Sequence, residues 1–268
     1  MIVKAYQPRP PSGAALEQLV QVRRGIYIVH PWPALLIEKL SAVAVADLHI
    51  GLEEQREREG IHIPRSLLPE ILAYVTRPLE RLGVQRVVLL GDVKHEFGYP
   101  QPTEWAGVKK LLRVLLQKGL HVDVVRGNHD NYIAAILREL GLPLHDPALL
   151  LEDIAFFHGH LDPHVLPEEA RLIVTGHEHP SVVIRDDLGF RHRYKAFLEG
   201  TWKGRELVVL PSVSPLALGS DVNELPPSEL LSPILRSSEL EAFVPYLIDI
   251  GHEVKRFPNI GLLRPLAR

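Results

Sequence analysis

Five short apolar runs, rich in β-branched residues, recur along the chain, and each ends abruptly in Asp, His, Gly or Asn. The runs occupy residues 42–46, 87–90, 122–125, 154–157 and 172–175. Short runs that are apolar at every position are typical of strands buried on both faces of a sheet. The pattern therefore predicts five core strands whose C-terminal ends carry polar side chains.

Helical spacing of apolar residues fills several of the intervals between these runs. Residues 64–82 form one such segment, which we expect to bend at Pro78. A second helix is predicted to begin with Thr103 as its N-cap and to continue to residue 118, and a third spans 131–140. Strands that alternate with helices indicate an α/β sheet.

The remaining segments have the pattern of β-hairpins. Hairpins at 182–195 and 244–257 and a strand at 206–210 follow the last of the five runs. A pair of strands at 26–29 and 35–38 precedes the first run. We expect these parts to supply a second sheet, which predicts a two-sheet β-sandwich flanked by helices, with a site at the C-terminal ends of the strands.

The same patterns predict a single domain over residues 1–268, without internal repeats. Residues 1–12, rich in proline and basic side chains, are expected to form a loose arm. Residues 181–268 are the β-rich part that completes the second sheet. Within it, residues 220–240 are expected to form a surface loop with a short helix rather than a linker between domains.

The composition indicates the class of protein and its expected place in the cell. The chain has 46% hydrophobic and 24% charged residues, which is ordinary for a soluble globular protein. Neither an apolar run of about 20 residues nor a secretory signal is found, so we expect a cytoplasmic protein with no membrane partner. Scarce methionine with abundant leucine, arginine, glutamate and proline favours a thermophilic source. The net charge of −3 argues against a broad basic surface, although a local basic groove stays open.

Histidine is the residue type whose content says most about function. The chain has 14 histidines and no cysteine, which rules out disulfides and thiolate metal sites. Imidazole is the commonest metal ligand in proteins, so the positions of the histidines matter. Several of them directly follow the five apolar runs.

Seven oxygen and nitrogen donors stand at the ends of the predicted strands. They are Asp47, His49, Asp92, Asn128, His158, His177 and His179. Ligands of open α/β sheets bind beyond the carboxyl ends of the strands, so we expect these side chains to share one crevice. Seven donors would crowd one ion, but they suit two ions about 3.5–4 Å apart that are bridged by a carboxylate, an arrangement adapted to in-line attack on phosphorus.

Five motifs, in this order and spacing, resemble the signature of the calcineurin-like metallophosphoesterases over residues 42–180. They are Asp47-Leu48-His49, Gly91-Asp92, Gly127-Asn128-His129-Asp130, His158 and Gly176-His177-Glu178-His179. Each motif alone is weak, but all five together, each after a predicted strand, form a strong signal. The resemblance implies the two-sheet fold of this family and phosphoester hydrolysis with two divalent metal ions.

The resemblance also implies a role for each motif residue. The first ion would be bound by Asp47, His49 and His179, and the second by Asn128, His158 and His177, with Asp92 bridging both. His129 would contact the phosphate and protonate the leaving oxygen. Manganese is favoured because sites rich in oxygen and nitrogen donors accept it, while iron, zinc and nickel remain alternatives.

A histidine at position 95 distinguishes this chain from the protein phosphatases of the superfamily, which carry Asp followed by Arg there. In having a histidine at this position, the chain resembles the SbcD-type repair nucleases and their archaeal relatives. In those nucleases this histidine lies beside the equivalent of His129. We therefore expect His95 to assist His129 or to touch the substrate. Residues 47–51 are also similar to the nucleases.

Simpler interpretations apply to other residues. His160 is an alternative to His158 as the ligand, and would otherwise contact a ligand or the substrate. Glu178 is expected to be exposed, and residues 53–59 to form an exposed helix with ion pairs. A basic set is interpreted as a solvated hairpin face rather than a phosphate-binding track; it comprises Arg185, Arg191, Arg193, Lys195, Lys203 and Arg205.

Three hypotheses for function follow. The first is a dimetal phosphodiesterase acting on nucleic acid or nucleotides, including single-stranded nucleic acid. The second keeps the chemistry but acts on small phosphomonoesters or cyclic nucleotides. The third is a non-catalytic scaffold subunit with the same fold, which is disfavoured because such a protein is expected to have lost ligands, and here all seven are present. The oligomeric state is not predicted.

Overall fold

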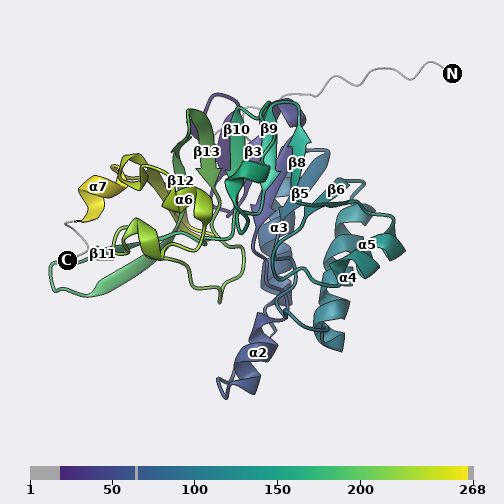
Figure 1. Cartoon of the computed structure of the whole chain (residues 1–268). Helices are drawn as coiled ribbons and strands as arrows, with labels where there is room; N and C mark the ends of the chain where they lie inside the picture. The colour runs from purple at the N-terminus through teal and green to yellow at the C-terminus, as the bar shows by residue number, and fades with distance from the viewer. Residues whose placement is uncertain (1–18, 64–65, 265–268) are drawn as a thin grey trace.

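Four layers, in the order helices, sheet, sheet, helices, make up the computed structural model of the chain, which describes residues 19–63 and 66–264 (Figure 1). The α/β fold of two sheets flanked by helices is thus confirmed. The loose arm expected at residues 1–12 lies outside the described residues. Within the described part of the chain, no helix is long and apolar enough to cross a membrane.

The first sheet has the strand order β1-β2-β3-β4-β5-β6-β7. Its strands are β1 (Leu19–Arg23), β2 (Ile26–Val29), β3 (Leu35–Ile37), β4 (Ala42–Ala46), β5 (Arg86–Leu90), β6 (His121–Val125) and β7 (Leu144–His145). Strands β4 to β7 run parallel to one another. Its outer face is covered by three helices, α3 (Leu68–Leu82), α4 (Pro102–Gln117) and α5 (Ile133–Leu140).

The second sheet has the order β15-β14-β12-β13-β10-β9-β8, with β11 paired to β12. Its strands are β8 (Ala148–Leu151), β9 (Ile154–Phe157), β10 (Leu172–Thr175), β11 (Ser181–Arg185), β12 (Arg191–Trp202), β13 (Arg205–Val209), β14 (Val244–Asp249) and β15 (Glu253–Arg256). Three short helices lie on its outer face: α6 (Pro233–Arg236), η4 (Leu240–Ala242) and α7 (Ile260–Leu263).

Burial on both faces explains why the core strands are apolar at most positions; Asp123 in β6 is a buried exception that pairs with Arg86 and His145. In β4, Val43 and Val45 pack beneath the helices, whereas Ala44 and Ala46 face the second sheet. The period-two alternation of a strand thus sends successive side chains into two different cores. Small alanines on the inner face leave room for the larger side chains of the opposite sheet, such as Phe156.

Two expectations about sheet membership are wrong. The predicted N-terminal pair, β2 and β3, belongs to the first sheet, because β3 is joined to β4 by only the short η1 turn (Glu38–Leu40) and pairs with it directly. Conversely, β9 and β10 lie in the second sheet, not beside β4, β5 and β6. An apolar run shows that a strand is buried, but it does not show which sheet contains the strand.

Several element boundaries also differ from expectation. Helix α4 has Gln101 as its N-cap and Pro102 at its start, so Thr103 is already inside the helix. Proline suits that first position because its missing N–H has no partner there anyway.

The predicted exposed helix is α2 (Leu52–Arg58), where Arg56 pairs with Glu59. The predicted loop at 220–240 contains η3 (Pro227–Glu229) and α6, and η2 (Pro163–Val165) follows β9.

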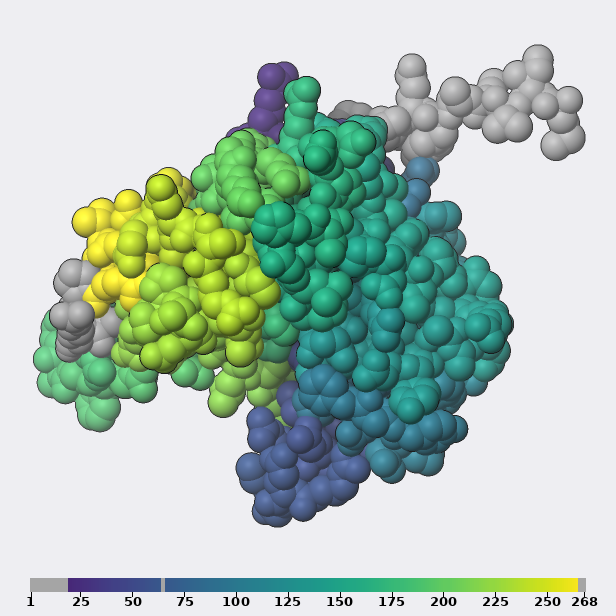
Figure 2. All heavy atoms as spheres, viewed as in Figure 1, coloured from purple at the N-terminus to yellow at the C-terminus, as the bar shows by residue number. Residues whose placement is uncertain are grey.

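The outline of the molecule is notched between two projecting parts. Helix α2 extends from the lower edge in Figure 1, and the β11–β12 hairpin extends to the left. Figure 2 shows open space between them when all atoms are drawn. On the inner side, β4 continues into a parallel bridge between Ala46 and Ser212, which joins the first sheet to the loop after β13.

Candidate metal centre

Two groups of side chains that each contain a carboxylate converge at the C-terminal ends of strands from both sheets, and a third group consists of His49, His95 and His129. The first group is Asp47, His49 and His179, and the second is Asp92, His158 and His177. Within each group, one potential ligand atom from each residue lies within 4.8 Å of the others. The groups adjoin, because His158 Nε2 lies 2.9 Å from Asp47 Oδ1 and 3.6 Å from Asp92 Oδ2.

Asn128, the remaining predicted ligand, has a buried side-chain oxygen with no hydrogen-bond donor among the described residues. Leaving such a group unsatisfied costs about 1–3 kcal/mol, so native proteins rarely do it without a reason. A cation would satisfy this oxygen. His129, the next residue, donates its backbone N–H to Asp92 Oδ1 over 2.9 Å, which holds this loop beside the second group.

Glycines that precede the site residues are required by close packing. A Cβ atom on Gly127 would lie 2.1 Å from Asp92 Oδ1, and one on Gly91 would lie 2.2 Å from the imidazole of His158. Neither distance is sterically allowed. The Gly-Asp and Gly-Asn pairs of the motifs therefore bring backbone and side chains into a site that any larger residue would open.

Backbone strain is concentrated at the same place. Five residues of the two groups have left-handed φ angles: Asp47 (56°), His49 (45°), Asp92 (48°), His177 (69°) and His179 (47°). Each such conformation costs on the order of 1–3 kcal/mol for a residue other than glycine, and it persists only where its surroundings enforce it. Here the loops after β4 and β5 are tied together, with His49 N–H donating to Asp92 O over 2.9 Å. Such strain typically marks functional sites.

The electrostatics of the centre favour positive charge. Burial tends to raise the pKa of Asp47, but the neighbouring His179 and His158 hold it well below its usual range. Burial raises the pKa of Asp92 to about 7, against the effect of His158. Burial tends to lower the pKa of His158, yet Asp92 and Asp47 raise it to about 9. A proton on His158 therefore lies between two buried carboxyl groups, where a metal cation would serve the same electrostatic purpose.

The imidazoles of His177 and His49 are held neutral. Burial, together with the charge on His158, lowers the pKa of His177 to about 3. Burial and the neighbouring His179 place the pKa of His49 well below its usual value. A metal ligand must offer an unprotonated nitrogen, so these residues are in the required state at neutral pH. With the two carboxylates and the orphaned oxygen of Asn128, the donor set fits a pair of divalent cations.

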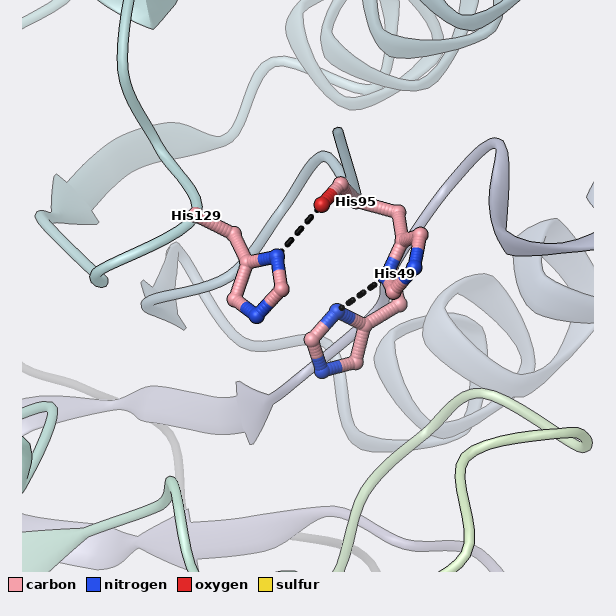
Figure 3. Close-up of side chains that lie close together, drawn as sticks. All are labelled: His49, His95 and His129. Atoms are coloured by element: carbon pink, nitrogen blue, oxygen red, sulfur yellow. Dashed lines mark hydrogen bonds between the residues drawn. The ribbon is translucent and has the colours of Figure 1, made fainter. Parts of the chain in front are cut away.

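His129 lies at the edge of this centre with one ring nitrogen engaged and the other free (Figure 3). Its Nδ1 donates to the backbone carbonyl oxygen of His95. Its Nε2 lies 3.9 Å from Asp92 Oδ2, at the boundary of the second group. Because a carbonyl can only accept, Nδ1 carries a proton and Nε2 is the nitrogen that remains for chemistry.

The side chain of His95 contacts His49. His95 Nδ1 lies 3.2 Å from His49 Nδ1, and His95 Nε2 is hydrogen-bonded to Gln55 Oε1. Gln55 turns its oxygen toward His95 because its amide nitrogen donates to Glu59 over 3.0 Å. His95 Nε2 must then donate, so its Nδ1 accepts from His49 Nδ1–H. That tautomer leaves His49 Nε2 bare, on the side where His179 Nε2 lies 3.2 Å away.

His158 and His160 occupy different positions relative to the metal centre. His158 is fully buried and belongs to the second group, whereas His160 is in neither group. His160 Nδ1 instead lies 3.1 Å from His158 Nδ1, on the side of the ring away from the carboxylates. Burial and the neighbouring His158 lower the pKa of His160 to about 4. This geometry places His160 behind His158, and the choice of His158 as the ligand stays a prediction.

Glu178 was expected to be exposed, and this is wrong. Its side chain is fully buried, and its carboxylate accepts the backbone N–H groups of Leu231 over 3.1 Å and Ser232 over 2.7 Å. Its neighbours on both sides face the metal centre, so its side chain points the opposite way, into the segment around α6. His177 and His179 are two positions apart, so the side chain between them could have been expected to point away from the centre.

Two further carboxylates that support the centre were not predicted. Asp130 is buried, and it accepts N–H groups from Val93 over 3.0 Å and from Gly127 over 2.9 Å, which links the loops after β5 and β6. Glu104 accepts the N–H groups of His95 over 2.8 Å and Glu96 over 2.7 Å. Asp130 stands within a motif and could have been found, whereas Glu104 gives no signal in the sequence.

Three of the six residues of the basic hairpin set, Arg185, Arg191 and Arg193, form ion pairs with other described residues. Arg191 and Arg193 contact Asp221, and Arg191 also contacts Glu224. Lys195 is an exception to the solvated face, since its Nζ donates to the carbonyl oxygens of Ser212 over 2.9 Å and Ser214 over 2.6 Å. These contacts do not favour a free phosphate-binding track on the hairpin.

Comparison with known proteins adds evidence on the fold. No protein-family model matches the sequence, and no curated protein is detectably similar. The nuclease MPE of Pseudomonas putida aligns with a TM-score of 0.62 and 22% identity, covering 90% of this chain and 99% of that one. The chain has the fold of nuclease MPE. The two-sheet fold expected from the metallophosphoesterase resemblance is therefore confirmed.

Two phosphoesterase structures align less well than nuclease MPE does. Yfce, a phosphoesterase from E. coli, aligns at 20% identity with a TM-score of 0.41, covering 81% of this chain and 98% of its own. A predicted phosphoesterase from Streptococcus pneumoniae aligns at 17% identity with a TM-score of 0.29, covering 81% of this chain and 95% of its own. At such scores, neither likeness adds to the comparison with nuclease MPE.

Proposed function

We propose that this chain is a dimetal phosphodiesterase that acts on nucleic acid or nucleotides. The observation that carries the proposal is the adjacency of the two side-chain groups, which His158 joins by its contacts to Asp47 and Asp92. Asp47, His49 and His179 would hold the first ion. Asn128, His158 and His177 would hold the second, with Asp92 bridging both. We favour manganese, because nitrogen and carboxylate donors without thiolates accept it.

The protein's own residues supply the framework for this reaction. Two divalent ions in the centre would polarise the phosphoryl oxygens and activate the attacking water. The residues with left-handed φ angles and the closely packed glycines fix the ligand side chains before any substrate binds. Little reorganisation would therefore accompany the reaction. Asp130 and Glu104 hold the loops that carry Asp92 and His95.

His129 is the proposed general acid. Its ring is oriented by the carbonyl of His95, and its free Nε2 is directed toward the centre, from where it could donate a proton to the leaving oxygen. Burial lowers the pKa of His129 even though the His95 carbonyl opposes this effect. An anionic phosphate bound beside the imidazole would favour its protonated form. His95 would act through His49 and His129 rather than on the substrate.

A nucleic-acid substrate is favoured over a small phosphomonoester by two arguments. The sequence around His95 is similar to the SbcD-type nucleases, and nuclease MPE, a solved structure with the same fold, is a nuclease. Both arguments are analogies, so the substrate must be tested directly.

The test is a manganese-dependent activity screen on single-stranded DNA, RNA, a generic diester and a monoester. We expect cleavage of diesters, loss of activity in Asp92→Asn, and a fall in kcat of about 10²- to 10⁴-fold in His129→Ala with unchanged metal content. Full activity in a metal-replete His129→Ala variant would refute the acid role. Purified protein that binds no divalent ion and cleaves no phosphoester would instead support the scaffold hypothesis.

A further inference from the structure

Three exposed aromatic side chains lie on the two loops that carry His95 and the proposed general acid, His129. Phe97, Tyr99 and Tyr132 are 53%, 78% and 56% exposed. Phe97 begins this cluster at the metal centre, since its ring centroid lies 3.7 Å from that of His129. Tyr99 and Tyr132, on the same two loops, contact each other with ring centroids 5.8 Å apart and planes at 63°. Large aromatic rings contribute most when buried, so a cluster left this open indicates a binding surface.

The cluster is built from two loops that the structure holds together. Phe97 and Tyr99 lie between β5 and α4, whereas Tyr132 directly precedes α5. Asn131 bridges the loops by donating its side-chain N–H to the carbonyl oxygen of Phe97 over 3.1 Å. Tyr132 has a φ of 70°, a costly conformation for a bulky residue. Both loops also carry parts of the centre, His95 on one and His129 on the other.

A purely structural role would account for Phe97 alone. Its ring covers one side of His129, while His95 stacks on that imidazole with ring centroids 5.1 Å apart and planes at 21°. Tyr99 and Tyr132 shield nothing comparable, because more than half of each residue is open to solvent. The open faces of these two rings are available to a ligand with flat apolar faces.

We propose that Phe97, Tyr99 and Tyr132 form a stacking ledge for unpaired bases of a nucleic-acid strand whose phosphate lies at His129. The assignment rests on the proposed function and defines its substrate as single-stranded. Each base of a single strand has a free face that can stack on an aromatic ring, whereas the bases of a duplex are stacked on one another. The chain's net charge of −3 gives little long-range attraction to polyanions, so stacking must supply much of the affinity.

The ledge is tested with two strands of equal length, an oligothymidylate and its abasic counterpart, cleaved by the manganese-loaded enzyme. The measured quantity is the ratio of kcat/KM for the base-bearing strand to that for the abasic strand. Stacking is worth about 1–3 kcal/mol per base, so Tyr99→Ala should lower this ratio about tenfold or more. Tyr132→Asn should lower it too, and asparagine tolerates the left-handed φ. Tyr99→Phe, which keeps the ring, should retain the ratio.

Phe190→Ala is the matched control, since Phe190 is a 64% exposed aromatic residue at the turn of the β11–β12 hairpin. An unchanged ratio in both Tyr99→Ala and Tyr132→Asn overturns the ledge while leaving the proposed function intact. If the wild-type protein cleaves neither strand, the strand-cleaving function fails, and fluorescence anisotropy with the labelled oligothymidylate decides the ledge. Weaker binding by Tyr99→Ala than by wild type then supports it, and equal binding or no binding overturns it.

Discussion

His158 carries the positive charge that balances two buried carboxyl groups. Because Asp92 and Asp47 raise the pKa of His158 to about 9, its imidazole is protonated at neutral pH before a metal binds. A nitrogen ligand must lose that proton, so metal binding and proton release are coupled. Apparent metal affinity should therefore rise with pH up to about 9.

We expect this coupling to release about one proton per protein when manganese binds near pH 8. Affinity should fall about tenfold for each pH unit below 9, since one proton competes with the metal. The fall should become steeper below pH 7, because the pKa of Asp92, raised by burial to about 7, adds a second competing proton. Calorimetry in buffers of different ionisation enthalpy counts the released protons. Binding at pH 8 without proton release would contradict the assignment of His158.

The sequence located the donors of the centre, but not the residues that support them. Asp47 and His49 could be found because they follow an apolar strand directly and belong to a motif. Glu178 was misjudged because its partners, Leu231 and Ser232, are more than 50 positions away in the chain. A hydrogen bond across that separation leaves no local pattern. Whether the donors bind metal stays a prediction.

At the scale of elements, the turn at Gly127 fixes how closely the loop after β6 approaches Asp92. Gly127→Ala places a Cβ 2.1 Å from Asp92 Oδ1, which is closer than atoms can pack, so the two loops must separate. We expect manganese affinity to fall at least tenfold and activity to fall with it. The measurement is metal titration by calorimetry together with the diesterase assay. Gly98→Ala is the control, because a Cβ there would lie in ordinary contact with the Glu96 carboxylate, at 4.0 Å. An equal loss in both variants would refute the steric argument.

Glu178 anchors the segment before α6 to the turn after β10. Glu178→Ala leaves two backbone N–H groups without their acceptor in a buried place, which should cost about 1–3 kcal/mol of unfolding free energy for each group that water cannot reach. Chemical denaturation measures this loss. Glu178→Gln keeps one oxygen acceptor and should lose less. Equal stability of wild type and Glu178→Ala would show that the anchor contributes nothing.

Local sequence patterns predicted where strands begin and end better than they predicted which strands are neighbours in a sheet. Strands β4, β9 and β10 have the predicted ends, because turn residues bound each apolar run. Assignment to a sheet failed for β9 and β10, since it depends on where the chain crosses between sheets, near the short strands β7 and β8. Neither of those strands was predicted. Strand β7 has only two residues, which is too few for a period to show.

At the scale of the whole molecule, the candidate centre lies where the two sheets meet. Asp47 and Asp92 follow β4 and β5 of the first sheet, while His158 and His177 follow β9 and β10 of the second. One direct link already exists, since His177 N–H donates to Asp47 Oδ2 over 2.9 Å. Ions bound by residues of both sheets would join the sheets at their C-terminal edge, in addition to the apolar core between them.

We therefore expect manganese to slow amide hydrogen exchange at the ends of β4 and β10 together, although they lie in different sheets. A ligand that binds only the folded state stabilises it by RT ln(1 + [L]/Kd), about 2.7 kcal/mol at 100 times Kd, so exchange through global unfolding should slow about 100-fold. Asp92→Asn, which lacks the bridging carboxylate, should show much less of this protection in both sheets. Protection confined to β4 and β5 would mean that the ions are held by the first sheet alone, and the shared centre would have to be abandoned.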